Sequence, residues 1–269
     1  MKGVWLLAQI TFKEGIRNRI LLGILFFGIA LCVGNLIFTN MFAHELGKVA
    51  VDVALSVVSI AGLVVIFFMG INLLIKDLDK RTIYMVLSRP ISRRQYVIGK
   101  FFGLGLLILT SVLILGLFAT GSVKLAMLNA PDYVPPNFSW LTFAIALGYA
   151  FISLLITMSL ALLFTCAISS SFLAVILTAS GYFIGQNVEL LRKIYARAEG
   201  ASEGWWLEKF AEGVSWVFPN LAAFDLKTTA AYGLPLDVSH LVWTALYGVS
   251  YMGLILILAI FVFQRRELS

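Results

Sequence analysis

The sequence predicts an all-α integral membrane protein with six transmembrane helices, and two observations support this fold class. The composition is too apolar for a soluble protein: 61% of the 269 residues are hydrophobic and 13% are charged, whereas about 25% of the residues of a soluble domain are charged. The apolar residues also gather in long uncharged runs, which is typical of helices that cross a membrane. We therefore expect one membrane domain, residues 1–269.

Six runs are long enough to cross the bilayer. The predicted spans are residues 20–38, 53–75, 97–121, 140–168, 172–188 and 241–263. An even number of spans places both termini on the same side. The loops of that side carry 13 of the 20 Lys and Arg residues, and cytoplasmic loops are the ones enriched in these residues. Both termini and residues 76–100 are therefore predicted to lie in the cytoplasm.

The segment before the first span, residues 1–19, is predicted to be a helix that lies on the membrane surface. Its apolar stripe recurs at helical spacing, as Trp5, Ala8, Phe12 and Ile16. Lys13 and Arg17 lie roughly opposite, as in amphipathic interfacial helices. Arg17 and Arg19 are expected to contact lipid headgroups. The alternative is a frayed leader before the first span.

The loop between the last two predicted spans, residues 189–239, is too long and too apolar for a plain connection. Its spacing predicts short helices that dip into the outer leaflet, since tryptophans settle at headgroup level. The residues that indicate this are Trp205, Trp206, Phe210, Gly213, Trp216 and Val217. Whether these helices shape an exit path or cap the bundle stays open.

The chain carries no recognisable catalytic, cofactor or metal constellation. The histidines, His44 and His240, lie far apart at predicted outer edges, and no Asp or Glu lies in the centre of a span. The basic residues lie just outside the spans, where anionic headgroups favour them, so the net charge of +6 does not indicate a nucleic-acid partner. A membrane enzyme that uses serines alone, or a channel, stays open.

Four polar side chains lie in or near the spans: Asn35, Asn72, Gln186 and Asn187. Such groups most often hydrogen-bond between helices in a membrane. We therefore interpret them as interhelical contacts rather than as ligands of a substrate.

Residues 76–100 are the most charged stretch of the chain, with seven basic and two acidic residues. Ser92-x-x-Gln95 has the pattern of a capping box, which predicts that a helix begins at Ser92. Arg93 and Arg94 then lie in the first helical turn, where the helix dipole disfavours positive charge. Anionic headgroups are expected to offset that effect at both arginines.

A separate short helix is predicted before that start, over residues 77–89. Its apolar residues fall on two faces, with Leu78 and Met85 on one side and Ile83, Tyr84 and Leu87 on the other. A helix that rests on a bilayer needs one apolar face. The second face indicates burial in another protein, or, alternatively, packing of an extended second span against its own neighbours.

The residues of this segment also resemble a known family. The string Asp79-Lys80-Arg81-Thr82-Ile83-Tyr84, then Leu87-Ser88-x-Pro90-x-Ser92-Arg93 and Tyr96-x-x-Gly99-Lys100, resembles the signature of ABC-2 type permeases, most closely the branch linked with multicopper-enzyme maturation. Three further stretches are similar to that family: Thr11-Phe12-Lys13-Glu14-x-x-Arg17, Pro219-Asn220-Leu221-x-x-Phe224 and Arg265-Arg266-Glu267-Leu268.

The resemblance implies a permease subunit that has no catalytic site and no cofactor of its own. Two such subunits, identical or different, would pair in a bacterial or archaeal inner membrane, and an ATPase subunit holding ATP and Mg would dock on each. Residues 1–19 would be the elbow helix and 77–89 the coupling helix. The residues implied at the ATPase interface are Lys80, Arg81, Ile83, Tyr84, Leu87 and Arg89.

Two outcomes of such ATPase motion stay open. One is export of a cargo, for which the aliphatic and aromatic spans favour an amphipathic or lipidic molecule. The other is transmission of the motion to a periplasmic or membrane partner without translocation. A continuous polar path through the paired subunits would favour export, and a sealed interface would favour transmission.

Overall fold

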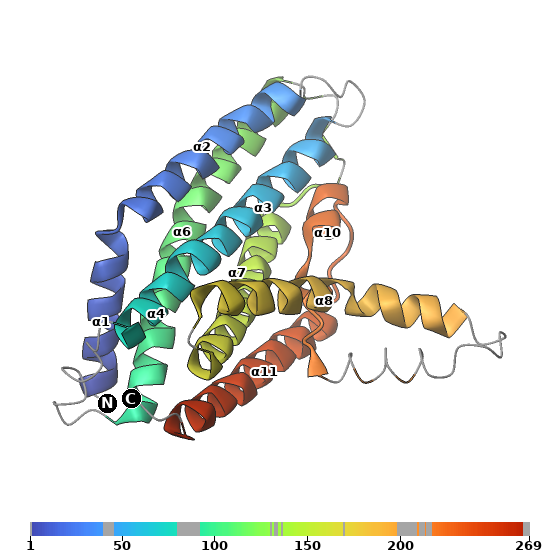
Figure 1. Cartoon of the computed structure of the whole chain (residues 1–269). Coiled ribbons are helices and arrows are strands. Elements are labelled where there is room, and N and C mark those ends of the chain that lie inside the picture. Colours follow the sequence, from blue (N-terminus) through green and yellow to red (C-terminus); the bar gives the residue numbers. More distant parts are fainter. Residues whose placement is uncertain are drawn as a thin grey trace.

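The all-α fold class is confirmed for the part of the chain that the structure describes. The computed structural model describes residues 2–39, 46–79, 92–129, 131, 134, 135, 137–168, 170–197, 209, 213 and 217–265. These residues form a bundle of helices and contain no strand (Figure 1). The predicted coupling helix, most of the outer loop before residue 217 and the last four residues lie outside these ranges.

The helices follow one another along the chain with short connections. They are α1 (Lys2–Ile16), α2 (Arg19–Thr39), α3 (Leu46–Val64), the π-helix η1 (Val65–Gly70), α4 (Ile71–Asp79), α6 (Arg93–Asn129), α7 (Trp140–Ala167), α8 (Ser171–Arg197), the 3₁₀ helix η3 (Ala222–Phe224), α10 (Lys227–Tyr232) and α11 (Val238–Arg265).

Five of these stretches are long and apolar enough to cross a membrane. They are Gly47–Ile75, Arg93–Asn129, Trp140–Ala167, Ser171–Leu190 and Val238–Arg265. Helices α1 and α2 meet at an angle of 63° and provide a sixth crossing when the bent pair is counted as one span. The described helices therefore agree with a protein of five to six membrane helices.

Helix α6 is the central element of the bundle. It contacts α1, α2, α3, α7 and α11, while α11 and α8 pack on the other side against α7. Figure 1 shows the starts of α1 and α6 and the end of α11 at one end of the bundle, and α10 toward the other. We call the first the α6-start end and the second the α10 end.

Two helices are longer than the apolar runs predict. Helix α6 begins at Arg93 and ends at Asn129, although its predicted span covers 97–121, and α8 continues to Arg197 beyond the predicted limit of 188. Polar residues can extend a helix past the hydrocarbon layer because each added residue still forms a backbone hydrogen bond. Hydropathy therefore locates the membrane layer but not the helix ends.

The second span contains a local change of helix type. Residues Val65–Gly70 form a π-helix between α3 and α4. Just after it, the Asn72 side chain donates to the Phe68 carbonyl (2.6 Å) and accepts a hydrogen bond from Ser171 Oγ (3.1 Å). A π-turn widens the helix and often marks a functional position. Here it immediately precedes α4, the helix that leads into residues 80–91.

The interpretation of the four polar residues as interhelical contacts is right for two of them. Asn35 donates from α2 to the Ala50 carbonyl of α3 (3.0 Å), and Asn72 joins α4 to α8. Gln186 instead donates to the Tyr182 hydroxyl (3.2 Å) and Asn187 to the Phe183 carbonyl (2.8 Å), both within α8. A residue four positions earlier is always within reach on a helix, so position alone does not identify the partner.

Candidate functional site

The predicted ATPase-contact residues lie in the one long gap between described helices at the α6-start end. Lys80, Arg81, Ile83, Tyr84, Leu87 and Arg89 fall outside the described residues. The structure does describe both flanks of this gap, since α4 ends at Asp79 and the chain resumes at Ser92. The geometry of these flanks determines which helices a movement of residues 80–91 would reach.

The start of α6 is fixed by the capping box that the sequence predicts. The Ser92 backbone N–H donates to Gln95 Oε1 (3.0 Å), and the Gln95 backbone N–H donates to Ser92 Oγ (3.3 Å). These two reciprocal bonds satisfy two of the amide groups that a helix start leaves without partners. The prediction that a helix begins at Ser92 is confirmed, and α6 has a defined first turn directly after the gap.

Arg93 joins the start of α6 to the end of α11. Its Nη1 donates to the carbonyl oxygens of Phe263 (3.2 Å) and Gln264 (2.9 Å). The last carbonyls of a helix lack intrahelical partners and carry the negative end of the dipole. The guanidinium charge, unfavourable in its own helix, is therefore offset by α11. The sequence indicated the need for an offset but not this source.

The aromatic ring of Tyr96 strengthens the same junction. It stacks on Phe263 with ring centroids 5.5 Å apart, and both residues are buried. Lys100, one turn further along α6, is 3% exposed and its Nζ lies 5.9 Å from the centre of the Tyr96 ring, within the range of cation–π attraction. The junction between α6 and α11 is thus polar at its edge and packed inside.

Helix α1 is held against α6 by two glycines. A Cβ atom at Gly99 would lie 2.7 Å from Leu7 Cβ, and one at Gly103 would lie 2.7 Å from Thr11 Cβ and 2.8 Å from the Ala8 carbonyl oxygen. Only glycine permits this approach, as in other small-xxx-small contacts of membrane helices. Helix α1 therefore runs beside the first turns of α6, with Trp5, Leu6 and Ile10 exposed.

The four residues predicted to contact headgroups are not brought together as one site. Arg17 and Arg19 are exposed at the junction of α1 and α2, and Arg94 is exposed in the first turn of α6. Arg93 is partly buried because it reaches α11. Contact with headgroups stays a prediction for all four.

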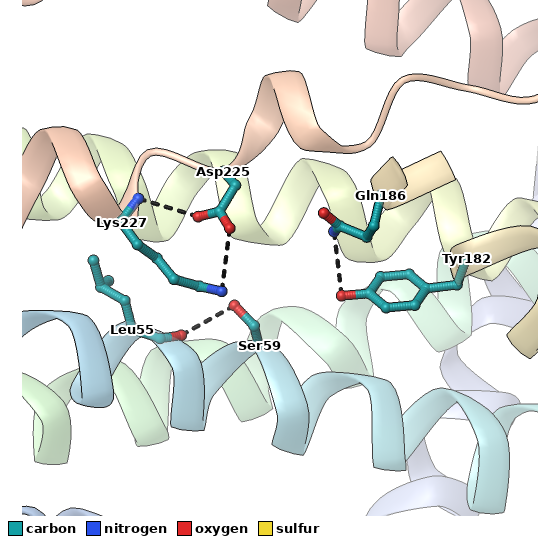
Figure 2. Close-up of polar contacts among 6 residues, drawn as sticks. All are labelled: Leu55, Ser59, Tyr182, Gln186, Asp225 and Lys227. Carbon is teal, nitrogen blue, oxygen red and sulfur yellow. Dashed lines mark hydrogen bonds and ion pairs between the residues drawn. The ribbon is translucent and has the colours of Figure 1, made fainter. Parts of the chain in front are cut away.

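A polar cavity lies between α3, α7, α8 and the outer segment that contains η3 and α10. Its polar lining comes from Ser59 of α3, Ser153 of α7, Tyr182 and Gln186 of α8, and the charged pair Asp225 and Lys227 (Figure 2). The space inside is about 30 Å³, and a single water needs roughly 10–15 Å³ measured in this way. In this conformation the cavity admits water but no larger molecule.

The charged pair closes this cavity from the outer segment. Lys227 Nζ lies 3.3 Å from Asp225 Oδ2, and the Lys227 backbone N–H donates to Asp225 Oδ1 (3.1 Å). Figure 2 shows the Lys227 side chain directed toward Ser59, whose hydroxyl donates to the Leu55 carbonyl (3.0 Å). The sequence did not single out Asp225 and Lys227, because two opposite charges in an outer loop resemble a solvated turn.

The stretch Pro219-Asn220-Leu221-x-x-Phe224 anchors the outer segment in the bundle. Leu221 and Phe224 are 0% and 1% exposed. The Leu221 backbone N–H donates to the Gly185 carbonyl of α8 (3.0 Å), and Phe224 stacks on Tyr247 of α11 with centroids 6.3 Å apart. The segment is therefore a packed part of the bundle that joins α8 to α11.

Buried hydroxyl groups do not assemble a nucleophilic site among the residues described. Six of them donate to carbonyls of their own helix: Ser111, Ser122, Thr157, Ser159, Thr165 and Thr178. This bonding is usual for Ser and Thr in membrane helices, where water is absent. Nothing in these contacts activates an oxygen for chemistry.

Comparison with known proteins gives one family and two relatives. The profile of the family described as ABC-2 family transporter protein matches residues 35–263. A probable ABC transporter permease protein NosY of Pseudomonas aeruginosa is 30% identical over 132 residues, which is 48% of this chain and 46% of the relative. A probable NosY permease of Stutzerimonas stutzeri is 28% identical over 118 residues, 42% of this chain and 43% of the relative. The chain thus spans about half the length of the curated relatives it matches.

Proposed function

Because the chain belongs to the ABC-2 transporter family, a family of ABC transporter membrane proteins, we propose that it is a permease subunit that couples ATP hydrolysis on a separate ATPase to export of an amphipathic or lipidic cargo. The ATPase subunits, two per complex, hold ATP and Mg. A second permease subunit, identical or different, completes the membrane part. The complex lies in a bacterial or archaeal inner membrane with both termini of this chain in the cytoplasm.

The observation that carries this proposal is the unbroken helix α6. It begins at the Ser92 cap, three residues after the end of the predicted coupling helix, and continues for 37 residues to Asn129. At about 1.5 Å per residue its length is roughly 55 Å, more than the thickness of the hydrocarbon layer. A movement imposed on residues 77–89 would therefore reach the opposite surface through one rigid element.

The junctions at the start of α6 support the same proposal. Arg93 and Tyr96 hold the end of α11, and Gly99 and Gly103 hold α1. Packed interfaces of this kind shift between discrete arrangements rather than deform continuously. An ATPase that moves the coupling helix would thus displace α1, α6 and α11 together, while α4 transmits the movement to the second span.

The test is a matched pair of leucine variants in the complex with its ATPase. In Leu87→Asp the apolar anchor becomes charged, and in Leu234→Asp the same change is made at an exposed leucine near the α10 end. Loss of one buried leucine costs about 1.5–3 kcal/mol, so ATPase binding should weaken roughly 10- to 100-fold for Leu87→Asp. Leu234→Asp should bind normally.

Co-purification of the ATPase and its turnover in proteoliposomes are the measurements. If Leu87→Asp retains wild-type ATPase binding and turnover, residues 77–89 are not the coupling helix. Tyr84→Asp provides an independent second variant on the same predicted face and should give the same loss.

Transmission of ATPase motion to an outer partner is the second candidate function. The close packing of the outer segment favours it, because the polar cavity has room for water alone and η3–α10 binds both α8 and α11. Vesicles that contain the complex separate the two functions. ATP-dependent accumulation of a labelled amphipathic cargo supports export, whereas ATP-dependent change of exchange in residues 217–237 without accumulation supports transmission.

A further inference from the structure

A groove between α1 and α4 carries an inference that does not depend on the ATPase. Its lining consists of Ile10, Lys13, Glu14, Arg17, Asn18 and Leu73. The space inside is about 640 Å³ and opens along one side of the bundle. This volume is within the range of sites that bind small organic molecules, about 300–1,000 Å³.

The lining residues of α1 occupy a helical stripe that the bundle leaves uncovered. Positions 10, 13, 14, 17 and 18 recur at intervals of three and four, which places them on one side of a helix. The neighbouring stripe, with Leu7, Ala8 and Thr11, packs against α6 and is buried. Lys13 and Arg17 are exposed. The structure thus uses one face of α1 for packing and leaves a second, charged face to form the groove.

The groove lies at the level where two apolar runs end. The run of α2 begins directly after Arg19, and the run of the second span ends at Ile75, two residues after Leu73 and just before Lys76 and Asp77. Charged residues that flank a span mark the headgroup layer of a bilayer. The opening of the groove therefore faces lipid headgroups, whichever side of the membrane this end occupies.

The charges of the lining favour an anion. Lys13 and Arg17 lie one helical turn apart, and no carboxylate of the described residues is within ion-pair distance of either. With Glu14 included, the lining carries one net positive charge. Ile10, which is 51% exposed, and Leu73 add an apolar surface beside the two cations. A cationic pair next to an apolar wall suits a molecule with a phosphate group and hydrocarbon chains.

We propose that this groove binds one anionic phospholipid, with its phosphate between Lys13 and Arg17 and the beginning of its acyl chains against Ile10 and Leu73. The lipid would bridge α1 to α4. Because Gly15 of α1 also packs against Met69 of the π-helix η1, a bound lipid stabilises the arrangement of α1, η1 and α4. A zwitterionic phospholipid lacks the net charge that matches the lining and binds more weakly.

Lipid titration of the full chain, purified with the subunits it retains, tests the charge requirement. The probe is phosphatidylglycerol, with phosphatidylcholine as the neutral comparison, and native mass spectrometry reports bound lipid. Each basic contact near a membrane surface is worth about fivefold in affinity. The double variant Lys13→Gln, Arg17→Gln should therefore bind phosphatidylglycerol roughly 20- to 30-fold more weakly than the wild type.

Arg94→Gln is the matched control, since it removes an exposed arginine of the same end of the bundle outside the groove. It should leave the titration unchanged. Equal weakening by Arg94→Gln would mean that general surface charge attracts the lipid, and an unchanged double variant would remove the basis of the site. Displacement of the lipid by an equal concentration of inorganic phosphate would identify a phosphate site and overturn the lipid assignment.

A second experiment uses the unaltered chain, so that folding of a variant plays no part. Phosphatidylglycerol with a photoreactive group near the glycerol is added to vesicles that contain the complex, and the crosslinked peptides are identified. The proposal predicts crosslinks within residues 10–18 and around residue 73. Crosslinks that are confined to other helices would overturn it. Loss of ATPase coupling in the Leu87→Asp variant would leave this result unaffected, so the two proposals fail separately.

Discussion

Substitution of Gly103 by alanine tests whether close contact with α6 holds α1 in place. The added Cβ would lie 2.7 Å from Thr11 Cβ and 2.8 Å from the Ala8 carbonyl oxygen, whereas ordinary contacts of such atoms begin near 3.4 Å. One of these neighbours is backbone, so the helices must separate by several tenths of an ångström. Overpacking of this kind costs about 1–3 kcal/mol, which shifts the docking equilibrium of α1 roughly 5- to 150-fold.

Hydrogen–deuterium exchange of residues 2–16 measures this shift, because exchange follows local opening. Gly121→Ala is the matched control: it lies on the same helix, and nothing within 4 Å meets its new Cβ. We expect faster exchange of α1 in Gly103→Ala and none of this effect in Gly121→Ala. Equal exchange of α1 in the two variants would refute the idea that the glycine contact positions α1.

Three further variants test the junctions of the bundle by thermal unfolding. Arg93→Gln loses the charged hydrogen bonds to the end of α11 and should destabilise the protein by about 2 kcal/mol, whereas Arg94→Gln, an exposed neighbour, should change stability by about 0.5 kcal/mol or less; equal effects would contradict the role of α11. Phe224→Ala empties a fully buried position and should cost about 3–5 kcal/mol, and a smaller loss would show that the outer segment is not a packed part of the bundle. Asp225→Asn breaks a partly exposed ion pair with Lys227, so we expect about 0–1 kcal/mol together with faster exchange of residues 217–237; a loss of several kcal/mol would indicate that this pair is a buried structural element instead.

Some features of the fold follow from local sequence and agree with the structure. The capping box at Ser92 and Gln95 involves residues three positions apart, so the short-range pattern contains all of its geometry. The apolar runs likewise predict the membrane helices, because a bilayer requires each buried backbone group to bond within its own helix. The resemblance of residues 79–100 to ABC-2 permeases is confirmed by the family match over residues 35–263.

Other features depend on residues far apart in the chain. Arg93 meets the carbonyl of Gln264, 171 residues away, and no local pattern indicates this partner. The lone Gly99-x-x-x-Gly103 pattern is common in membrane helices, and α1 could be identified as its partner from the packing alone. Asp225 and Lys227 line a cavity only because the outer segment folds back between α3 and α8.

The sequence by itself determined that this chain is a helical membrane protein of the ABC-2 type, because hydropathy and helix caps act between neighbouring residues. Tertiary structure decided which helix surfaces meet: α1 on α6, α11 on the start of α6, and the outer segment between α3, α7 and α8. In a membrane, apolar surfaces gain little from meeting one another rather than lipid, so contact depends on close fit and on a few polar bonds. Those fits are properties of three-dimensional surfaces, and the order of residues along one helix does not specify them.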